Sequence, residues 1–338
     1  MSKVLEEALS IPEKIDYFNN NDKNNYDIII SKLNNKKIKN IITVARGTSD
    51  CAALFASYTF AKKLGLTTYS LPPSLITLED SKFDFSNSLI IIISQSGVSR
   101  DLIECERAAR DMGGETLTIS NNLKSPLINT SNYFFYINAG EEKAIAATKT
   151  FALTLLIIIK FIGLIESNKK LLKNINSLPD TLIKNKSNRW EYKNINNKIL
   201  NGFIISRGIG YALAAEMSLK FKELCQEQIE PFSSAEVMHG PKSLIQDSFK
   251  LFSLTLNDNS GLSVEKDIKE LNNKSKFLYK ISFKQNNKNN FYYLNNDSSE
   301  LDPIIVMSKF YPWLINYTSL KGLDPDNPRY LNKVTSTY

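Results

Sequence analysis

The most informative stretch of the chain is Leu89-Ile90-Ile91-Ile92-Ile93-Ser94-Gln95-Ser96-Gly97-Val98-Ser99. An isoleucine run that breaks abruptly into small hydroxylated residues and glycine predicts a buried strand followed by a tight loop. Apolar spacing predicts a helix over 102–112. The first N–H groups of a helix are unpaired and attract anions, and the serines and Gln95 add neutral donors. The loop is therefore a candidate phosphate site, with helix capping by Ser and Asp as the structural alternative.

Strands and helices alternate through the rest of the first half. Strands are predicted at 41–44, 67–70, 89–93, 116–119 and 133–137, and helices at 51–64, 102–112 and 149–165. This alternation is typical of βαβ units, so we predict an α/β fold with a mostly parallel sheet covered by helices on both faces.

The second half repeats the pattern. Thr43-Val44-Ala45-Arg46-Gly47 and Ile204-Ile205-Ser206-Arg207-Gly208 both place Arg-Gly between a strand and an Ala-rich helix, 161 positions apart, which predicts an internal duplication. Further strands are predicted at 250–256, 277–281 and 304–307. The predicted domains are 1–165 with a leading helix, a connecting helix and linker at 166–198, a second domain at 199–321 and a tail at 322–338.

The two halves differ in their loops. Thr48-Ser49 in the first half corresponds to Ile209-Gly210 in the second, and the strand 250–256 is followed by Asn257-Asp258-Asn259-Ser260-Gly261 rather than by a hydroxyl-rich loop. We therefore expect one anion site, in the first domain. Ligands of parallel sheets bind beyond the carboxyl ends of the strands, which places Gly47-Thr48-Ser49 and the serine loop on the same rim.

Composition excludes several classes of protein. The 338 residues carry a net charge of +7 without a dense basic block, so nucleic acid is not indicated. The three cysteines lie in apolar, helical contexts, and we expect them to be buried in a reducing compartment. A single histidine and no cysteine cluster argue against a zinc site. With no signal peptide at the N-terminus and a longest apolar stretch of only 151–159, we expect a soluble cytoplasmic protein.

Charged residues in the second half are candidates for chemistry. Glu216, Lys220 and Glu223 share one face of the predicted helix, where Lys220 could keep one carboxylate ionised and the other could act as a base. A solvated charged face is the alternative. His239, the only histidine, precedes Gly240-Pro241 and so lies outside a helix interior, where it could shuttle protons or have no role.

These residues together resemble the tandem form of the sugar isomerase (SIS) domain family, and above all the isomerase half of glutamine:fructose-6-phosphate amidotransferases. The resemblance covers nearly the whole chain from about residue 30. It is carried by Arg46-Gly47-Thr48-Ser49, Ser94-Gln95-Ser96-Gly97, Ala146-Ala147-Thr148-Lys149-Thr150-Phe151, Glu216 through Lys220 to Glu223, Glu236 with His239-Gly240-Pro241, and Asn327-Pro328-Arg329 with Leu331-Asn332-Lys333.

The resemblance implies two flavodoxin-like SIS domains and a phosphosugar ligand, with no cofactor and no metal. The residues implied in sugar and phosphate binding are Gly47, Thr48, Ser49, Ser94, Gln95, Ser96, Ser99, Ala146 and Ala147. Glu223 would move a proton between C1 and C2 of the sugar, and Lys220 would stabilise the open-chain intermediate. His239 would open the sugar ring from the neighbouring subunit of a homodimer, and Lys333 would close over the site from the tail.

Two departures from the amidotransferase pattern shape the predicted activity. The chain shows no glutaminase domain, because its first strand-loop-helix unit already starts near residue 41, and Arg46 stands where the amidotransferases have cysteine. We therefore predict a deaminase that converts glucosamine 6-phosphate to fructose 6-phosphate and ammonia. Another phosphosugar isomerase, a deglycase and a non-catalytic phosphosugar sensor are the alternatives, and the identity of the amino sugar stays open.

Overall fold

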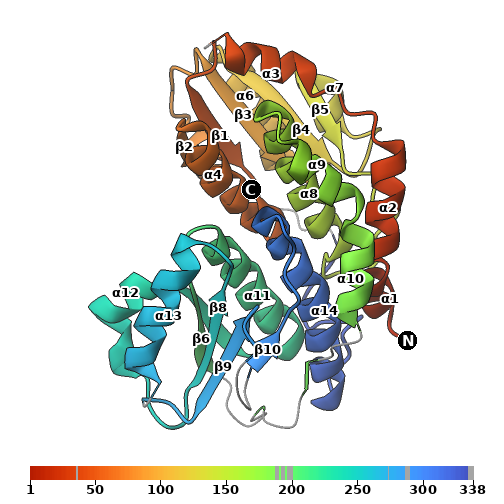
Figure 1. Ribbon diagram of the computed structural model, residues 1–338. Coiled ribbons are helices and arrows are strands. Elements are labelled where there is room, and N and C mark those ends of the chain that lie inside the picture. The colour runs from red at the N-terminus through yellow and green to blue at the C-terminus, as the bar shows by residue number, and fades with distance from the viewer. Residues whose placement is uncertain are drawn as a thin grey trace. The chain divides into compact units, whose positions relative to one another are not determined.

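The computed structural model describes residues 1–35, 37–186, 190, 191, 195, 201–272, 274–285 and 290–333 (Figure 1). The chain divides into two compact units, each with one β-sheet. The first-sheet unit comprises the described residues of Lys14–Glu142, Lys149–Leu172 and Asn332–Tyr338. The second-sheet unit comprises those of Met1–Glu13, Lys143–Thr148 and Lys173–Leu331.

Five parallel strands form the first sheet in the order β2-β1-β3-β4-β5. They are β1 (Asn40–Val44), β2 (Thr67–Ser70), β3 (Ser88–Ile93), β4 (Glu115–Ser120) and β5 (Tyr133–Tyr136). The helices of this part are α3 (Asp27–Asn34), α4 (Thr48–Leu64), α5 (Ser74–Thr77), α6 (Arg100–Asp111), α7 (Pro126–Thr130) and α8 (Lys149–Ile165). The strand order reverses between β1 and β3, which is where flavodoxin-like sheets bind their ligands.

The second sheet has the order β10-β9-β8-β6-β7, and its strands are also parallel. They are β6 (Asn201–Ser206), β7 (Gln228–Ser233), β8 (Lys250–Thr255), β9 (Phe277–Ser282) and β10 (Asn290–Tyr292). The helices are α1 (Lys3–Leu9), α10 (Leu178–Lys186), α11 (Ile209–Cys225), α12 (Ser234–His239), α13 (Asn259–Leu271) and α14 (Asp302–Leu320), with the 3-10 turns Pro241–Leu244 and Ser299–Leu301. Helices α2 (Ile11–Asn21) and α9 (Lys169–Asn176) contribute residues to both units.

The internal duplication is visible in the backbone. Read from the opposite edge, the second sheet repeats the strand order of the first. Helices α4 and α11 both have 17 residues and start 161 positions apart. Gly47 and Gly208 precede them with φ of 56° and 60°, and Gly65 and Gln226 end them in the left-handed conformation. The predicted fold class, two α/β domains with parallel sheets flanked by helices, is confirmed.

Burial follows the predicted pattern. All six residues of β3 are buried, as expected for a parallel strand covered on both faces. Cys51, Cys105 and Cys225 are buried, as predicted. Burial raises the pKa of the Cys105 and Cys225 thiols to about 12, so that neither is a ready nucleophile. Within the described part of the chain, no helix combines the length and apolarity needed to cross a membrane.

The predictions for the second half need two corrections. The strand predicted at 304–307 is wrong, because these residues are buried within α14. Strands β7 and β10 were not predicted from the pattern. The predicted connecting segment 166–198 contains α9 and α10, and its residues 187–189, 192–194 and 196–198 lie outside the described residues.

Candidate active site

The loop after β3 makes a turn that requires glycine. Gly97 has φ +64°, and a Cβ added there would lie 2.3 Å from Ser125 Oγ, closer than Cβ atoms come to any neighbour. The buried Ser94 accepts a hydrogen bond from Gly97 N on its Oγ at 3.1 Å. Gly97 and Ser94 therefore fix the turn that leads from β3 into α6.

The segment after β4 binds the carbonyl groups of this loop. Asn121 N donates to Gln95 O at 3.1 Å, and Asn122 Nδ2 donates to Ser96 O at 3.0 Å. Carbonyl oxygens repel an anion. Because these two carbonyl groups already accept hydrogen bonds within the protein, an anion at this loop would contact its N–H and hydroxyl groups instead.

Ser99 stands at the N-cap position of α6, but its hydroxyl makes no capping hydrogen bond. The side chain of Asp101 accepts from Leu102 N at 2.9 Å and also pairs with Arg46. The capping alternative therefore does not account for Ser99. Its hydroxyl is a donor at the positive end of a helix.

The corresponding place in the second sheet is occupied by the protein itself. Asp258 precedes α13 and accepts from Gly261 N at 2.8 Å, so a carboxylate already sits at that helix N-terminus. A Cβ added at Gly208 would lie 2.4 Å from Ser260 Oγ, whereas at Gly47 no heavy atom of the described residues lies within 4 Å. These differences support the prediction of a single anion loop, in the first sheet.

The two predicted binding loops of the first sheet share one rim. β1 and β3 are adjacent and parallel, so the loops at their carboxyl ends lie at the same edge of the sheet. Arg46 Nε, from the loop after β1, lies 2.9 Å from Asp101 Oδ2, from the start of α6. Thr48 and Ser49, the first residues of α4, are partly buried at this rim. The geometry thus gathers the predicted phosphate-binding residues of both loops.

A second group of polar residues lies on α11 in the second-sheet unit. Lys220 Nζ lies 2.7 Å from Glu223 Oε2 and 3.4 Å from Glu216 Oε1. The side chains of Glu216 and Lys220 are 0% and 1% exposed, whereas that of Glu223 is 22% exposed. The solvated-face alternative is therefore wrong for Glu216 and Lys220. Glu223 is the carboxylate of the group that reaches solvent.

Glu216 has a partner that the sequence did not indicate. Tyr311 OH, from α14, donates to Glu216 Oε1 at 2.9 Å, while Glu216 Oε2 is buried with no hydrogen bond to a described residue. Burial raises the pKa of Glu216 to about 7, although Lys220 lowers it. Lys220 is therefore positioned by an ion pair with the buried Glu216, and it positions the partly exposed Glu223 by a second ion pair.

The remaining predicted residues occupy separate places. His239 ends α12 and is exposed, with no side-chain hydrogen bond to any residue that the structure describes. Ala146 is buried and Ala147 is partly buried, in the segment Lys143–Thr148 of the second-sheet unit. Lys333, in the first-sheet unit, lies 3.5 Å from the buried Glu142 carboxylate, and Glu142 accepts from Thr150 Oγ1 at 2.6 Å.

The predicted site residues therefore form two groups, each within one unit. The first-sheet unit holds the two phosphate loops and Lys333. The second-sheet unit holds the α11 group, His239 and the two alanines. Sequence reasoning missed Tyr311 and Glu142, because no local pattern links them to Glu216 and Lys333. Among the described residues, no three His, Cys, Asp or Glu side chains are grouped so as to hold a metal ion.

The protein is thus a pair of flavodoxin-like α/β domains, with a hydroxyl-lined loop at the switch point of the first sheet and a buried lysine between carboxylates in the second domain. Comparison with known families gives the same result. The SIS domain family model matches residues 33–162, which contain the whole first sheet. Residues 33–162 therefore form a SIS domain.

Individual relatives extend the likeness over both domains. The chain is 28% identical to a glutamine–fructose-6-phosphate aminotransferase (isomerizing) of Fusobacterium nucleatum, over 98% of this chain and 58% of that protein. It thus spans little more than half the length of the curated relatives it matches.

Two solved structures show the same fold. The C-terminal domain of the glucosamine-fructose-6-phosphate aminotransferase of Francisella tularensis matches with a TM-score of 0.83 and 24% identity, covering 97% of this chain and 98% of that one. Glucosamine-6-phosphate deaminase of Thermotoga maritima matches with a TM-score of 0.75 and 18% identity, covering 99% and 100%.

Proposed function

We propose that this protein is a phosphosugar enzyme that converts glucosamine 6-phosphate and water to fructose 6-phosphate and ammonia. The observation that carries the proposal is the pairing of Glu223, partly open to solvent, with a lysine buried between two carboxylates. A protein that only senses a phosphosugar needs the anion loop but has no use for a poised carboxylate, so an enzyme is favoured over a sensor.

In this proposal the loops of the first sheet hold the 6-phosphate. Ser94, Gln95, Ser96, Ser99, Thr48 and Ser49 supply neutral hydroxyl, amide and backbone donors. Ala146 and Ala147 allow the backbone to approach the sugar closely. Anchoring the phosphate restricts a flexible open-chain sugar and keeps its C1 and C2 atoms within reach of a base.

Glu223 is proposed as the base that moves the proton. It takes the proton from C2 of the open-chain aldehyde while O1 gains a proton, which gives an enolamine. It then returns the proton to C1 while the amino group loses a proton, which converts the enolamine into a C2 imine with a hydroxyl group on C1. Water then adds to the imine carbon, and ammonia leaves as the C2 ketone forms. Lys220, whose Nζ lies 2.7 Å from Glu223 Oε2, holds this carboxylate in position and stabilises the negative charge that develops during proton transfer.

Two further residues complete the proposed site. His239 would open the sugar ring, contributed by the second subunit of a homodimer, and its exposure on α12 supports a role toward a partner. Lys333 would exchange its contact with Glu142 for the open-chain sugar when the tail closes over the site.

The similarity to aminotransferases favours a second candidate, the same chemistry in the direction of amination. The sequence is 28% identical to the Fusobacterium nucleatum relative, whereas the likeness to the deaminase, at 18%, concerns the fold alone. In that direction fructose 6-phosphate and ammonia would give glucosamine 6-phosphate and water.

Assays in both directions test the proposal. The purified protein is incubated with glucosamine 6-phosphate, and ammonia and fructose 6-phosphate are quantified. A parallel reaction starts from fructose 6-phosphate with ammonium. Equal amounts of ammonia and ketose from the amino sugar support the deaminase. Product only in the second reaction supports the aminating isomerase, and binding without product in either supports the sensor.

A further inference from the structure

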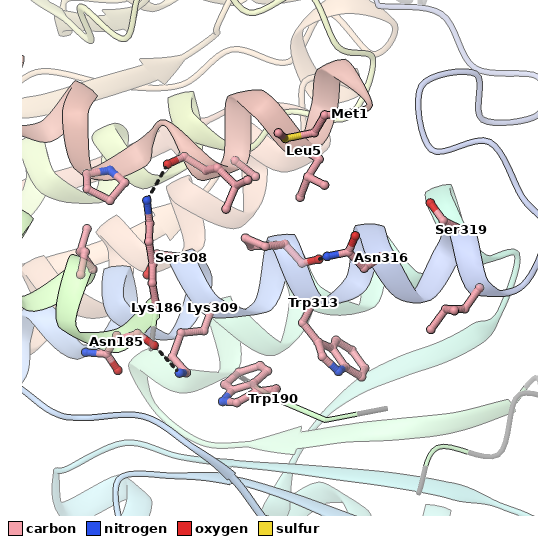
Figure 2. A pocket seen from close by; sticks show the side chains of 16 residues that line it. Met1, Leu5, Asn185, Lys186, Trp190, Ser308, Lys309, Trp313, Asn316 and Ser319 are labelled. Carbon is pink, nitrogen blue, oxygen red and sulfur yellow. Dashed lines mark hydrogen bonds between the residues drawn. The ribbon is translucent and has the colours of Figure 1, made fainter. Parts of the chain in front are cut away.

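A cavity of about 770 Å³ lies in the second-sheet unit, and none of the proposed site residues lines it. Helices α1, α10 and α14 form its walls together with Trp190, as Figure 2 shows. Its volume is within the range of small-molecule sites, and most of its surface is apolar. The described part of the fold therefore contains a concave site that the proposed sugar chemistry does not use.

The charge of this cavity has one sign. The 16 described residues that line it include two lysines and no carboxylate. Lys309 Nζ donates to Asn185 O at 3.0 Å, and Lys186 Nζ donates to Leu9 O at 3.2 Å (Figure 2). Burial lowers the pKa of Lys309 to about 8, so its ammonium group has lost part of its hydration and would gain from an anion.

The apolar wall of the cavity is aromatic. The rings of Trp190 and Trp313 lie 6.3 Å apart, centroid to centroid, at 67°. Trp190 Nε1 donates to Tyr292 O at 2.8 Å, which fixes the orientation of its ring. Lys309 Nζ lies 5.7 Å from the centroid of Trp190, so a cation borders the aromatic surface directly.

We propose that this cavity binds an aromatic anion, with its ring system against Trp190 and Trp313 and its acidic group beside Lys309. A phosphosugar does not suit the cavity, because an apolar wall would leave most sugar hydroxyls without hydrogen bonds. The inference is therefore independent of the proposed catalytic function.

Tryptophan fluorescence reports on binding in this cavity, because the chain has two tryptophans, Trp190 and Trp313, and both line the cavity. The probe is 8-anilinonaphthalene-1-sulfonate, an aromatic anion, titrated into the full-length protein while tryptophan quenching and energy transfer to the probe are followed. We expect saturable binding at one site. Lys309→Gln should weaken the binding about tenfold, since it removes a charged partner of the sulfonate.

Three controls distinguish binding in this cavity from binding elsewhere on the protein. Lys266→Gln removes an exposed lysine of α13 that does not line the cavity and should leave the affinity unchanged. N-phenyl-1-naphthylamine, which lacks the sulfonate, should bind wild type and Lys309→Gln equally. Ser308→Phe fills the cavity and should abolish binding of both probes. Equal sulfonate affinity in wild type and Lys309→Gln would overturn the proposal, as would displacement of the probe by glucosamine 6-phosphate.

Discussion

Lys220 Nζ lies 2.7 Å from Glu223 Oε2, and the lysine of this ion pair is buried while the carboxylate is partly exposed. The two residues are three positions apart on α11, so the helix itself sets their separation. This pair gives the proposed site a carboxylate that is held in one position and accessible to a ligand.

Glu216 should make the stability of the protein depend on pH. Its raised pKa means that the folded protein keeps this proton to higher pH than the unfolded chain, so the free energy of unfolding should fall as pH rises from about 4.5 to about 7. Glu216→Gln keeps an acceptor for Tyr311 and removes this slope. The contribution amounts to about 3 kcal/mol over the interval. Urea unfolding at a series of pH values measures it, and parallel curves for wild type and variant would refute it.

Replacing Ser99 should weaken binding of the phosphosugar but should hardly change the stability of the fold. Because its hydroxyl does not cap α6, Ser99→Ala should change the free energy of unfolding by less than about 0.5 kcal/mol. The same variant should weaken binding of glucosamine 6-phosphate about tenfold, measured by calorimetry. Asp258→Ala is the matched control, since it removes the cap of α13. It should cost about 1 kcal/mol of stability and leave the affinity unchanged, and the opposite pattern would exclude Ser99 from the site.

Gly97 and Gly47 should differ in their tolerance of a side chain. Both have positive φ, so alanine adds backbone strain of about 1–3 kcal/mol at either position. Gly97→Ala also places a Cβ against Ser125, whereas Gly47→Ala meets no described atom within 4 Å. Gly97→Ala should therefore lower the melting temperature more than Gly47→Ala. Adding Ser125→Gly should recover most of that difference, and no recovery would show that the contact with Ser125 is not the cause.

Much of the fold is predictable from local pattern, and the exceptions have physical reasons. The strand-loop-helix order and the duplication follow from apolar runs that end in Gly-containing loops. The run at 304–307 resembles a buried strand but belongs to a long buried helix, which periodicity alone cannot distinguish over four residues. β7 contains Pro231, which argues against a strand, yet β7 is an edge strand, where proline is tolerated.

The sequence indicated which residues are candidates for the site, but it did not indicate how their side chains are arranged or which are buried. The spacing of Glu216, Lys220 and Glu223 places them on one helix face, but burial decides which carboxylate is accessible, and α14 contributes to that burial through Tyr311. In the same way, the contact of Lys333 with Glu142 joins residues that are far apart in the sequence. Such long-range contacts leave no local signal.

Loss of the C2 hydrogen of the sugar tests the central claim, that Glu223 is the proton-transferring base, most directly. Glucosamine 6-phosphate deuterated at C2 is incubated with wild type and with Glu223→Gln, and NMR follows the loss of deuterium from C2 and its appearance at C1 of the product or in water. Calorimetry verifies that both proteins bind the phosphosugar. We predict that wild type removes the deuterium from C2 and that Glu223→Gln, with near-normal affinity, does so at least about a hundredfold more slowly. Removal at the wild-type rate by Glu223→Gln would show that Glu223 is not the base.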